Sequence, residues 1–137
     1  MYQKIKILTV LTLFFFTSCS NHNKNLNSKV TKPNSSLIKI ATDSKRYKVG
    51  ESIDIEATST KSGFVNIFIL NPKSQIMKIT SPIKKSFRTY LKTKIVGEYK
   101  IIAIYTPKKV NIKKEDFSIK NLKEEDIYDI YTFKINN

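Results

Sequence analysis

Residues 64–70 read FVNIFIL, and residues 99–106 read YKIIAIYT. Both stretches are short, almost entirely apolar, and rich in the β-branched and aromatic residues that favour strands. Turn residues bound them, since an Asn-Pro-Lys-Ser sequence occupies 71–74 and Pro107 ends the second stretch. We therefore predict two central strands of a β domain, with residues 76–80 as the return strand of a hairpin with the first.

Apolar and polar residues alternate in two earlier segments, 38–43 (IKIATD) and 53–58 (IDIEAT). A period of two places one set of side chains in a core and the other in water. Residues 127–135 (IYDIYTFKI) predict a last strand. Tyr128 and Tyr131 are three residues apart, so their side chains point to opposite faces of this strand. We therefore expect one of the two to be exposed. Several short strands at this spacing predict an all-β fold, a small immunoglobulin-like β-sandwich or Greek-key barrel.

A charged stretch at 108–126 separates the second apolar strand from the last one. Phe117 and Ile119 within it predict a short strand, and residues 121–126 (NLKEED) predict one helical turn. The whole domain spans residues 37–137, about a hundred residues, which suffices for one hydrophobic core.

The N-terminus has the order of a secretory signal peptide. Residues 1–6 carry two lysines and no acid, residues 7–16 are apolar apart from two threonines, and small residues follow at 17 and 18. The apolar run is too short to cross a bilayer, which takes about 20 such residues. We therefore expect residues 1–18 to be removed on export.

Cys19 changes this expectation from secretion to anchoring. The sequence Phe16-Thr17-Ser18-Cys19 resembles the lipobox of bacterial lipoproteins, although Leu usually stands at the first position. The resemblance implies cleavage before Cys19 and acylation of its thiol, with several acyl chains that together give a stable anchor. Ser20 in place of Asp implies transfer to the outer membrane, facing the periplasm. The alternative is an ordinary signal peptide with an incidental cysteine, but a lone cysteine in an exported protein needs a reason.

A polar segment joins this anchor to the domain. Residues 20–36 (SNHNKNLNSKVTKPNSS) contain almost nothing apolar, so burial cannot offset the entropy lost on ordering them. We predict a disordered tether over residues 19–36 that begins with the acylated cysteine. The tether holds the single histidine of the chain, His22, whose Asn and Lys neighbours do not form a metal site.

The chain has 25 Lys and Arg residues against 11 Asp and Glu, a net charge of +14. Such a balance suits a binder of nucleic acid, anionic lipid or another polyanion. Lys, Ile and Asn are used heavily throughout, however, which favours a solvated surface that follows from composition. Export also argues against nucleic acid, so we expect a membrane contact through the lipid and an envelope protein as the partner.

Three motifs stand out in the strand regions: YKVGESIDI at 47–55, GFVNIFILNP at 63–72 and GEYKIIAI at 97–104. Together they resemble the bacterial domain of unknown function 4384, over residues 37–107. Members of that family often stand alone as lipoproteins or are joined to signalling or envelope modules, and no catalytic residues are established for them. The chain departs from the family at 80–82, where Thr-Ser-Pro stands in place of a Phe-Pro-Asn stretch.

The domain contains no Cys, His or Trp, so the usual pairs of nucleophile and base are missing from its sequence. Two acidic groups remain, Glu115 with Asp116, and Glu124 with Glu125 and Asp126. The sequence around them is not that of a calcium-binding loop, and lysines flank both groups. We expect no catalysis, cofactor or metal, and we identify these acids as the candidate contacts for a basic partner.

The segment 107–126 that holds these acids is the predicted partner-binding region, because long irregular connections in compact domains are often functional. The expected function is that of a non-enzymatic envelope lipoprotein, an interaction or accessory module of a larger assembly. The alternative is an outer-membrane lipoprotein of a type VI secretion system, which is also a small lipid-anchored β-sandwich. The motifs at 47–55 and 63–72 favour the first interpretation.

Overall fold

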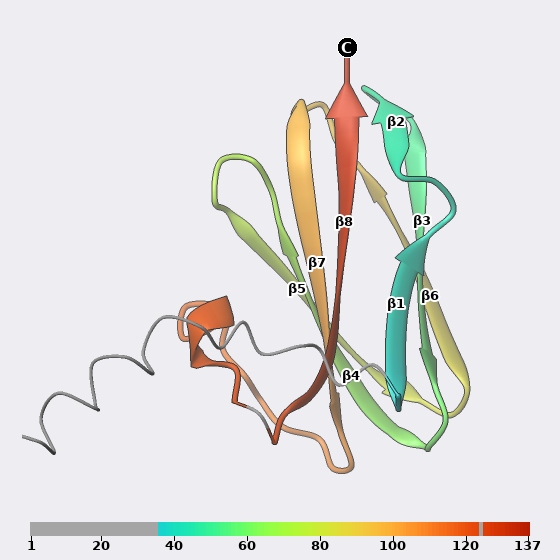
Figure 1. Ribbon diagram of the computed structural model, residues 1–137, viewed down its shortest axis with the longest axis vertical. Helices are drawn as coiled ribbons and strands as arrows, with labels where there is room; N and C mark the ends of the chain where they lie inside the picture. The colour runs from blue at the N-terminus through green and yellow to red at the C-terminus, as the bar shows by residue number, and fades with distance from the viewer. Residues whose placement is uncertain (1–35, 124) are drawn as a thin grey trace, which may run out of the picture. The chain divides into compact units, whose positions relative to one another are not determined.

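The computed structural model of the protein describes residues 36–123 and 125–137. In these residues the chain forms strands and one short 3-10 helix, and the strands make two sheets of a β-sandwich, as predicted (Figure 1). The elements are β1 (Ile38–Thr42), β2 (Arg46–Lys48), β3 (Ser52–Ser59), β4 (Gly63–Leu70), β5 (Ile76–Ile83), β6 (Ser86–Lys92), β7 (Gly97–Thr106), η1 (Ile119–Asn121) and β8 (Ile127–Asn136).

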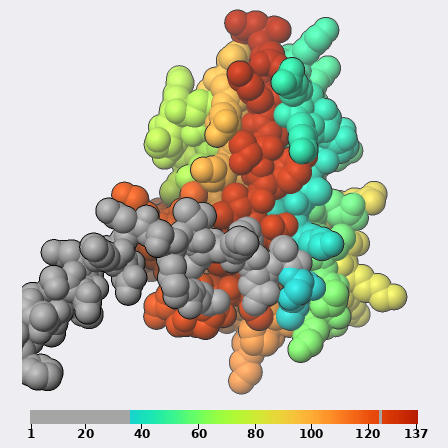
Figure 2. All heavy atoms as spheres, viewed as in Figure 1, coloured from blue at the N-terminus to red at the C-terminus, as the bar shows by residue number. Residues whose placement is uncertain are grey.

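One sheet has the strand order β1-β3-β6 and the other has the order β2-β8-β7-β4-β5. All neighbouring strands are antiparallel except β2, which runs parallel to β8. This division of the strands resembles the immunoglobulin-like arrangement, with two additional edge strands, β2 and β5, on the larger sheet. The two apolar stretches that predicted central strands are β4 and β7, which pair with each other inside the larger sheet. Figure 2 shows the side chains of β8 between those of β7 and those of β1 and β2.

A tyrosine at the start of β7 ties this strand to the loop before it. The Tyr99 hydroxyl donates to the carbonyl oxygen of Ile95 over 3.0 Å, and it lies 2.9 Å from the hydroxyl of Thr93. A tyrosine that hydrogen-bonds to the backbone a few residues upstream at this strand is a feature of immunoglobulin-like sandwiches. The contact fixes the loop after β6 against the end of the sandwich.

The inner core lies between the two sheets. The predicted alternation is confirmed, because Ile38, Ile40, Ile53, Ile55 and Ala57 are all buried there. These side chains meet alternate residues of the larger sheet, which are Val65, Ile67, Ile69, Tyr99, Ile101, Ala103, Tyr105, Phe133 and Ile135.

An outer core lies on the other face of the larger sheet, beneath residues 107–126, which we call the cover. Phe68 and Ile102 are fully buried in it, and the ring of Phe117 from the cover stacks on that of Phe68 at 3.9 Å with an interplanar angle of 5°. Ile104 and Tyr128 complete the buried set. The central strands are therefore apolar at nearly every position because both of their faces are buried.

The cover differs from its prediction in two details. Phe117 and Ile119 do not form a strand, since Phe117 is used to cover Phe68 and has no strand partner. The helical turn is a 3-10 turn at Ile119–Asn121 and not at 121–126, because the side chain of Ser118 accepts a hydrogen bond from the backbone N–H of Lys120 and caps the turn there.

Two strands were not predicted. β2 has only three residues, too few for a period to appear in the sequence, and β6 (SFRTYLK) places Thr89 inward and Tyr90 outward. The turn at 71–74 is confirmed, with a hydrogen bond of 3.0 Å from the backbone N–H of Ser74 to the carbonyl oxygen of Asn71. Gly50 has a φ of +82°, a value that glycine adopts without strain, at the turn through which the chain passes from β2 into β3.

Several predictions fall on residues that lie outside the described part of the chain: the signal peptide at 1–18, the acylation of Cys19, nearly all of the 19–36 tether with His22, and Glu124. Within residues 36–123 and 125–137, no helix has the length and apolar character needed to span a membrane.

Candidate interaction surfaces

The acids predicted to contact a partner lie on the solvent side of the cover. Glu115, Asp116 and Glu125 are exposed, and Asp126 is half-buried. A carboxylate oxygen of Asp126 accepts a hydrogen bond of 2.7 Å from the backbone N–H of Lys123, which folds the chain back at this point. The ammonium group of Lys123 is 3.9 Å from the Glu125 carboxylate, with both side chains more than two-thirds exposed, so this ion pair contributes little to stability.

Of the four predicted acids that the structure describes, two lie together. Asp116 and Asp126 both line a hollow of about 290 Å³ beside Phe117 and Leu122, whereas Glu115 and Glu125 do not line it. The cover therefore has two sides of different chemistry. Its apolar side chains other than the exposed Val110 pack on the larger sheet, and its charged side chains lie mostly on the solvent side.

The expectation of an exposed tyrosine in the last strand is wrong. Tyr128 is buried in the outer core and Tyr131 is half-buried against the inner core, because the first half of β8 is covered on both faces. The exposed tyrosine is Tyr90 on β6, with 72% of its surface accessible. It was missed because β6 was not predicted, although polar and less polar residues do alternate along Ser86–Lys92.

Tyr90 lies on the outer face of the smaller sheet, which we call the open face. In the register of the sheet Tyr90 is directly opposite Asp54, and Arg88 is directly opposite Glu56. The Nε of Arg88 donates to a carboxylate oxygen of Glu56 over 3.0 Å. These residues and Asp43 line a shallow hollow of about 390 Å³, so the open face combines one large aromatic ring with a rim of charged groups.

Asp43 is held in its charged form at the edge of the open face. Its carboxylate accepts hydrogen bonds from the Tyr47 hydroxyl and from the backbone N–H of Asp54, and the bond from Tyr47 is the main reason that the pKa of Asp43 is lowered. Burial raises the pKa of Tyr47, and its bond to Asp43 raises it further. The hollow on the open face is therefore lined by the carboxylates of Asp43, Asp54 and Glu56 and by the guanidinium of Arg88.

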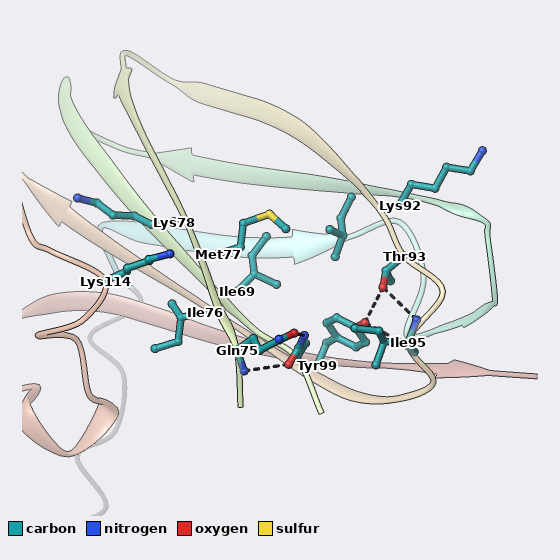
Figure 3. Close-up of a pocket in the computed structure, with 12 residues that line it drawn as sticks. Ile69, Gln75, Ile76, Met77, Lys78, Lys92, Thr93, Ile95, Tyr99 and Lys114 are labelled. Carbon is teal, nitrogen blue, oxygen red and sulfur yellow. Dashed lines mark hydrogen bonds between the residues drawn. The ribbon is translucent and has the colours of Figure 1, made fainter. Parts of the chain in front are cut away.

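A larger hollow, of about 520 Å³, lies where the edge of the sandwich opens between β5 and β6 (Figure 3). We call it the edge pocket. Its apolar lining consists of Ile69, Ile76, Met77, Leu91, Ile95 and the ring of Tyr99. Its polar lining consists of Asn71, Gln75, Thr93 and three lysines, Lys78, Lys92 and Lys114.

The neutral polar groups of the edge pocket largely bond to one another. The side-chain amide of Asn71 donates to that of Gln75 over 2.8 Å, and the Thr93 hydroxyl lies 2.9 Å from that of Tyr99. In the described part of the chain, no carboxylate lines the pocket. The groups left to meet a ligand are therefore apolar surface and ammonium groups.

No family model matches the chain, and no curated protein matches it. Among solved structures, the chain is similar to Spo0M, a sporulation control protein from Bacillus subtilis, with a TM-score of 0.38 and 9% sequence identity over 74% of this chain. The match covers 49% of Spo0M, so the chain corresponds to about half of that protein's length. A likeness of this strength carries no argument about function.

Proposed function

We propose that this chain is a lipid-anchored, non-enzymatic interaction module of the bacterial cell envelope. The observation that carries the interaction role is the open face, where Tyr90 of the edge strand β6 is 72% exposed. Tyrosine is among the residues that contribute most to protein interfaces, because its ring can be buried against a partner while its hydroxyl keeps a hydrogen bond. The surrounding charges would set the orientation of that partner.

The anchor in this proposal rests on the sequence before the domain. A charged start, an apolar run and two small residues precede Cys19, which is the single cysteine of the chain. The motif at 47–55 supports the same setting, because the domain of unknown function 4384 that it resembles is often found in lipoproteins. Ser20 after the cysteine supports the outer membrane as the destination.

The anchor is tested by Cys19→Ser in cells that are fed labelled palmitate. We expect the variant to take up no label and to remain as uncut precursor. Ser18→Ala keeps a small residue before the cysteine and should be labelled and cut like the native chain. Label in the Cys19→Ser protein would refute acylation at Cys19, and native protein found wholly in the inner membrane would refute the proposed destination.

The interaction role is tested by Tyr90→Ala in a crosslinking pull-down from intact cells. If Tyr90 is a central contact, its removal should weaken partner binding by about 2 kcal/mol, which is roughly thirtyfold in affinity. Val96→Ala is the matched control, because Val96 is also an exposed apolar residue, with 42% of its surface accessible, and does not lie on the open face. Equal recovery of the same crosslinked protein with both variants would place the partner elsewhere.

A further inference from the structure

We infer that the edge pocket binds a single-chain amphiphile with an anionic head, of the kind represented by a fatty acid. The inference goes beyond the proposed interaction role, since the edge pocket and the open face lie on different parts of the sandwich. It rests on the shape of the opening, on the apolar residues at its floor and on the sorting of charges around it.

The shape of the opening follows from the course of the chain. β5 ends at Ile83 and β6 begins at Ser86, so the two strands meet at this end although they belong to opposite sheets (Figure 1). In the described residues β5 pairs with β4 alone and β6 with β3 alone, so nothing ties their other ends together. The strands diverge toward Ile76 and Lys92, and the edge pocket occupies the wide end of this gap.

The floor of the pocket is part of the inner core. Ile69, Leu91 and Tyr99 come from three different strands and are 3%, 6% and 2% exposed. Met77 stands at the rim with 49% of its surface accessible, and a methionine side chain adapts readily to a varied apolar ligand. A volume of about 520 Å³ lies within the range of small-molecule sites, which are mostly apolar with a few fixed polar groups.

Lysine ammonium groups supply the polar recognition. Figure 3 shows Lys78 and Lys114 at one end of the pocket, whereas the Lys92 side chain at the other end points away from it. In the part of the chain that the structure describes, none of the three forms an ion pair, and Lys78 donates only to the side-chain oxygen of Asn111, over 3.2 Å. An anion at the end that holds Lys78 and Lys114 would therefore meet two cations that have no carboxylate partner.

The abundance of lysine in the chain does not account for this arrangement. Among the described residues, the hollow on the open face is lined by three carboxylates and one arginine. The edge pocket is lined by three lysines and, in the same residues, by no carboxylate. The two hollows therefore differ in the sign of the charges that line them. This difference indicates an anionic ligand for the edge pocket.

The ligand should also have an apolar body rather than many hydroxyls. A sugar would need free neutral donors and acceptors, but Asn71 bonds to Gln75 and Thr93 bonds to Tyr99. An alkyl chain on Ile69, Leu91 and Met77 would place its head at the edge of β5, which Lys78 lines from the outer face of the sheet, in register with Phe68. Such a ligand could come from free fatty acid or from a single-chain phospholipid of the membrane.

The test uses the chain from residue 19 onward with Cys19→Ser, which retains residues 36–137 and therefore both sheets and both cores. The probes are decanoate, which has the chain and the charge, decanol, which has the chain alone, and acetate, which has the charge alone. Calorimetric titration at low salt should give one saturable site for decanoate, with decanol and acetate at least tenfold weaker. A parallel titration with lysophosphatidylglycerol distinguishes the two sources of the ligand. Tighter binding of decanoate would indicate a free fatty acid, and tighter binding of lysophosphatidylglycerol would indicate a single-chain phospholipid.

Variants then locate the site. Lys78→Gln with Lys114→Gln should weaken the preferred anion at least tenfold and leave decanol binding unchanged. Lys48→Gln with Lys134→Gln removes two exposed lysines of the β2–β8 edge and should bind like the native chain. Met77→Glu should abolish binding while leaving the unfolding midpoint unchanged, since Met77 is exposed. The inference is overturned if neither anionic amphiphile binds, or if the two double variants bind alike.

Discussion

The outer faces of the two sheets differ, because one is buried under the cover and the other faces the solvent. The larger sheet is buried under the cover, with Phe117 stacked on Phe68, and its central strands are apolar at nearly every position. The smaller sheet leaves its outer face to the solvent in the described residues, and β3 alternates strictly along most of its length. A strand that is apolar on both faces therefore indicates a covered sheet, and a strand that alternates indicates a face that is free to meet water or a partner.

The largest effect should come from the contact that fixes the cover. Phe117→Ala removes the ring that lies 3.9 Å from Phe68 and should lower the free energy of unfolding by about 3–5 kcal/mol, out of a total near 5–15. Tyr90→Ala removes an equally large ring from the open face and should change it by less than about 0.5 kcal/mol. Urea unfolding of both variants measures the difference. Similar losses for the two would mean that the cover is not packed as a core.

A second comparison sets the inner core against the outer core. Ile67 and Ile102 are both fully buried, the first between the sheets and the second beneath the cover. If the two cores are equally well packed, Ile67→Ala and Ile102→Ala should each cost about 2–5 kcal/mol. A denaturant midpoint that falls for Ile67→Ala alone would show that the cover opens before the sandwich unfolds.

Most of the sandwich could be predicted from periodicity, and the reason is visible in these two residues. Ile67 and Ile102 lie in runs that are apolar at nearly every position because both faces are buried, with Asn66 as the hydrogen-bonded exception. The cover could not be predicted in the same way. Its packing depends on a contact between Phe117 and Phe68, which are far apart in the sequence, and it has no repeating period.

The surface sites, too, could be predicted only where a pattern in the sequence marks them. The acids of the cover were evident as charged residues in an irregular segment, whereas the open face was hidden because Tyr90 belongs to a strand whose inward residues include Thr89. The edge pocket could not be anticipated at all. Its lining comes from both sheets and from Lys114 of the cover, so it exists only once the sandwich has formed.

The smallest effects on stability are expected for the variants that test which outer surface binds the partner. The same variants should have the clearest effects on binding. Glu115→Lys and Glu125→Lys, made singly, should each change the free energy of unfolding by less than about 0.5 kcal/mol, because both side chains are exposed. If the cover contacts a basic partner, each should reduce its recovery in the pull-down, and more so at low salt, where exposed charges act over longer distances.

Glu98→Lys is the matched control for these reversals, since it changes the charge by the same amount at an exposed position of β7. A loss that is equal for all three reversals would reflect the net charge of the chain rather than a site. If Tyr90→Ala removes the partner and the cover variants retain it at every salt concentration, binding belongs to the open face. In that case the cover serves the fold, and its acids keep its solvent side polar. The opposite result would mean that the cover both completes a core and presents the partner site.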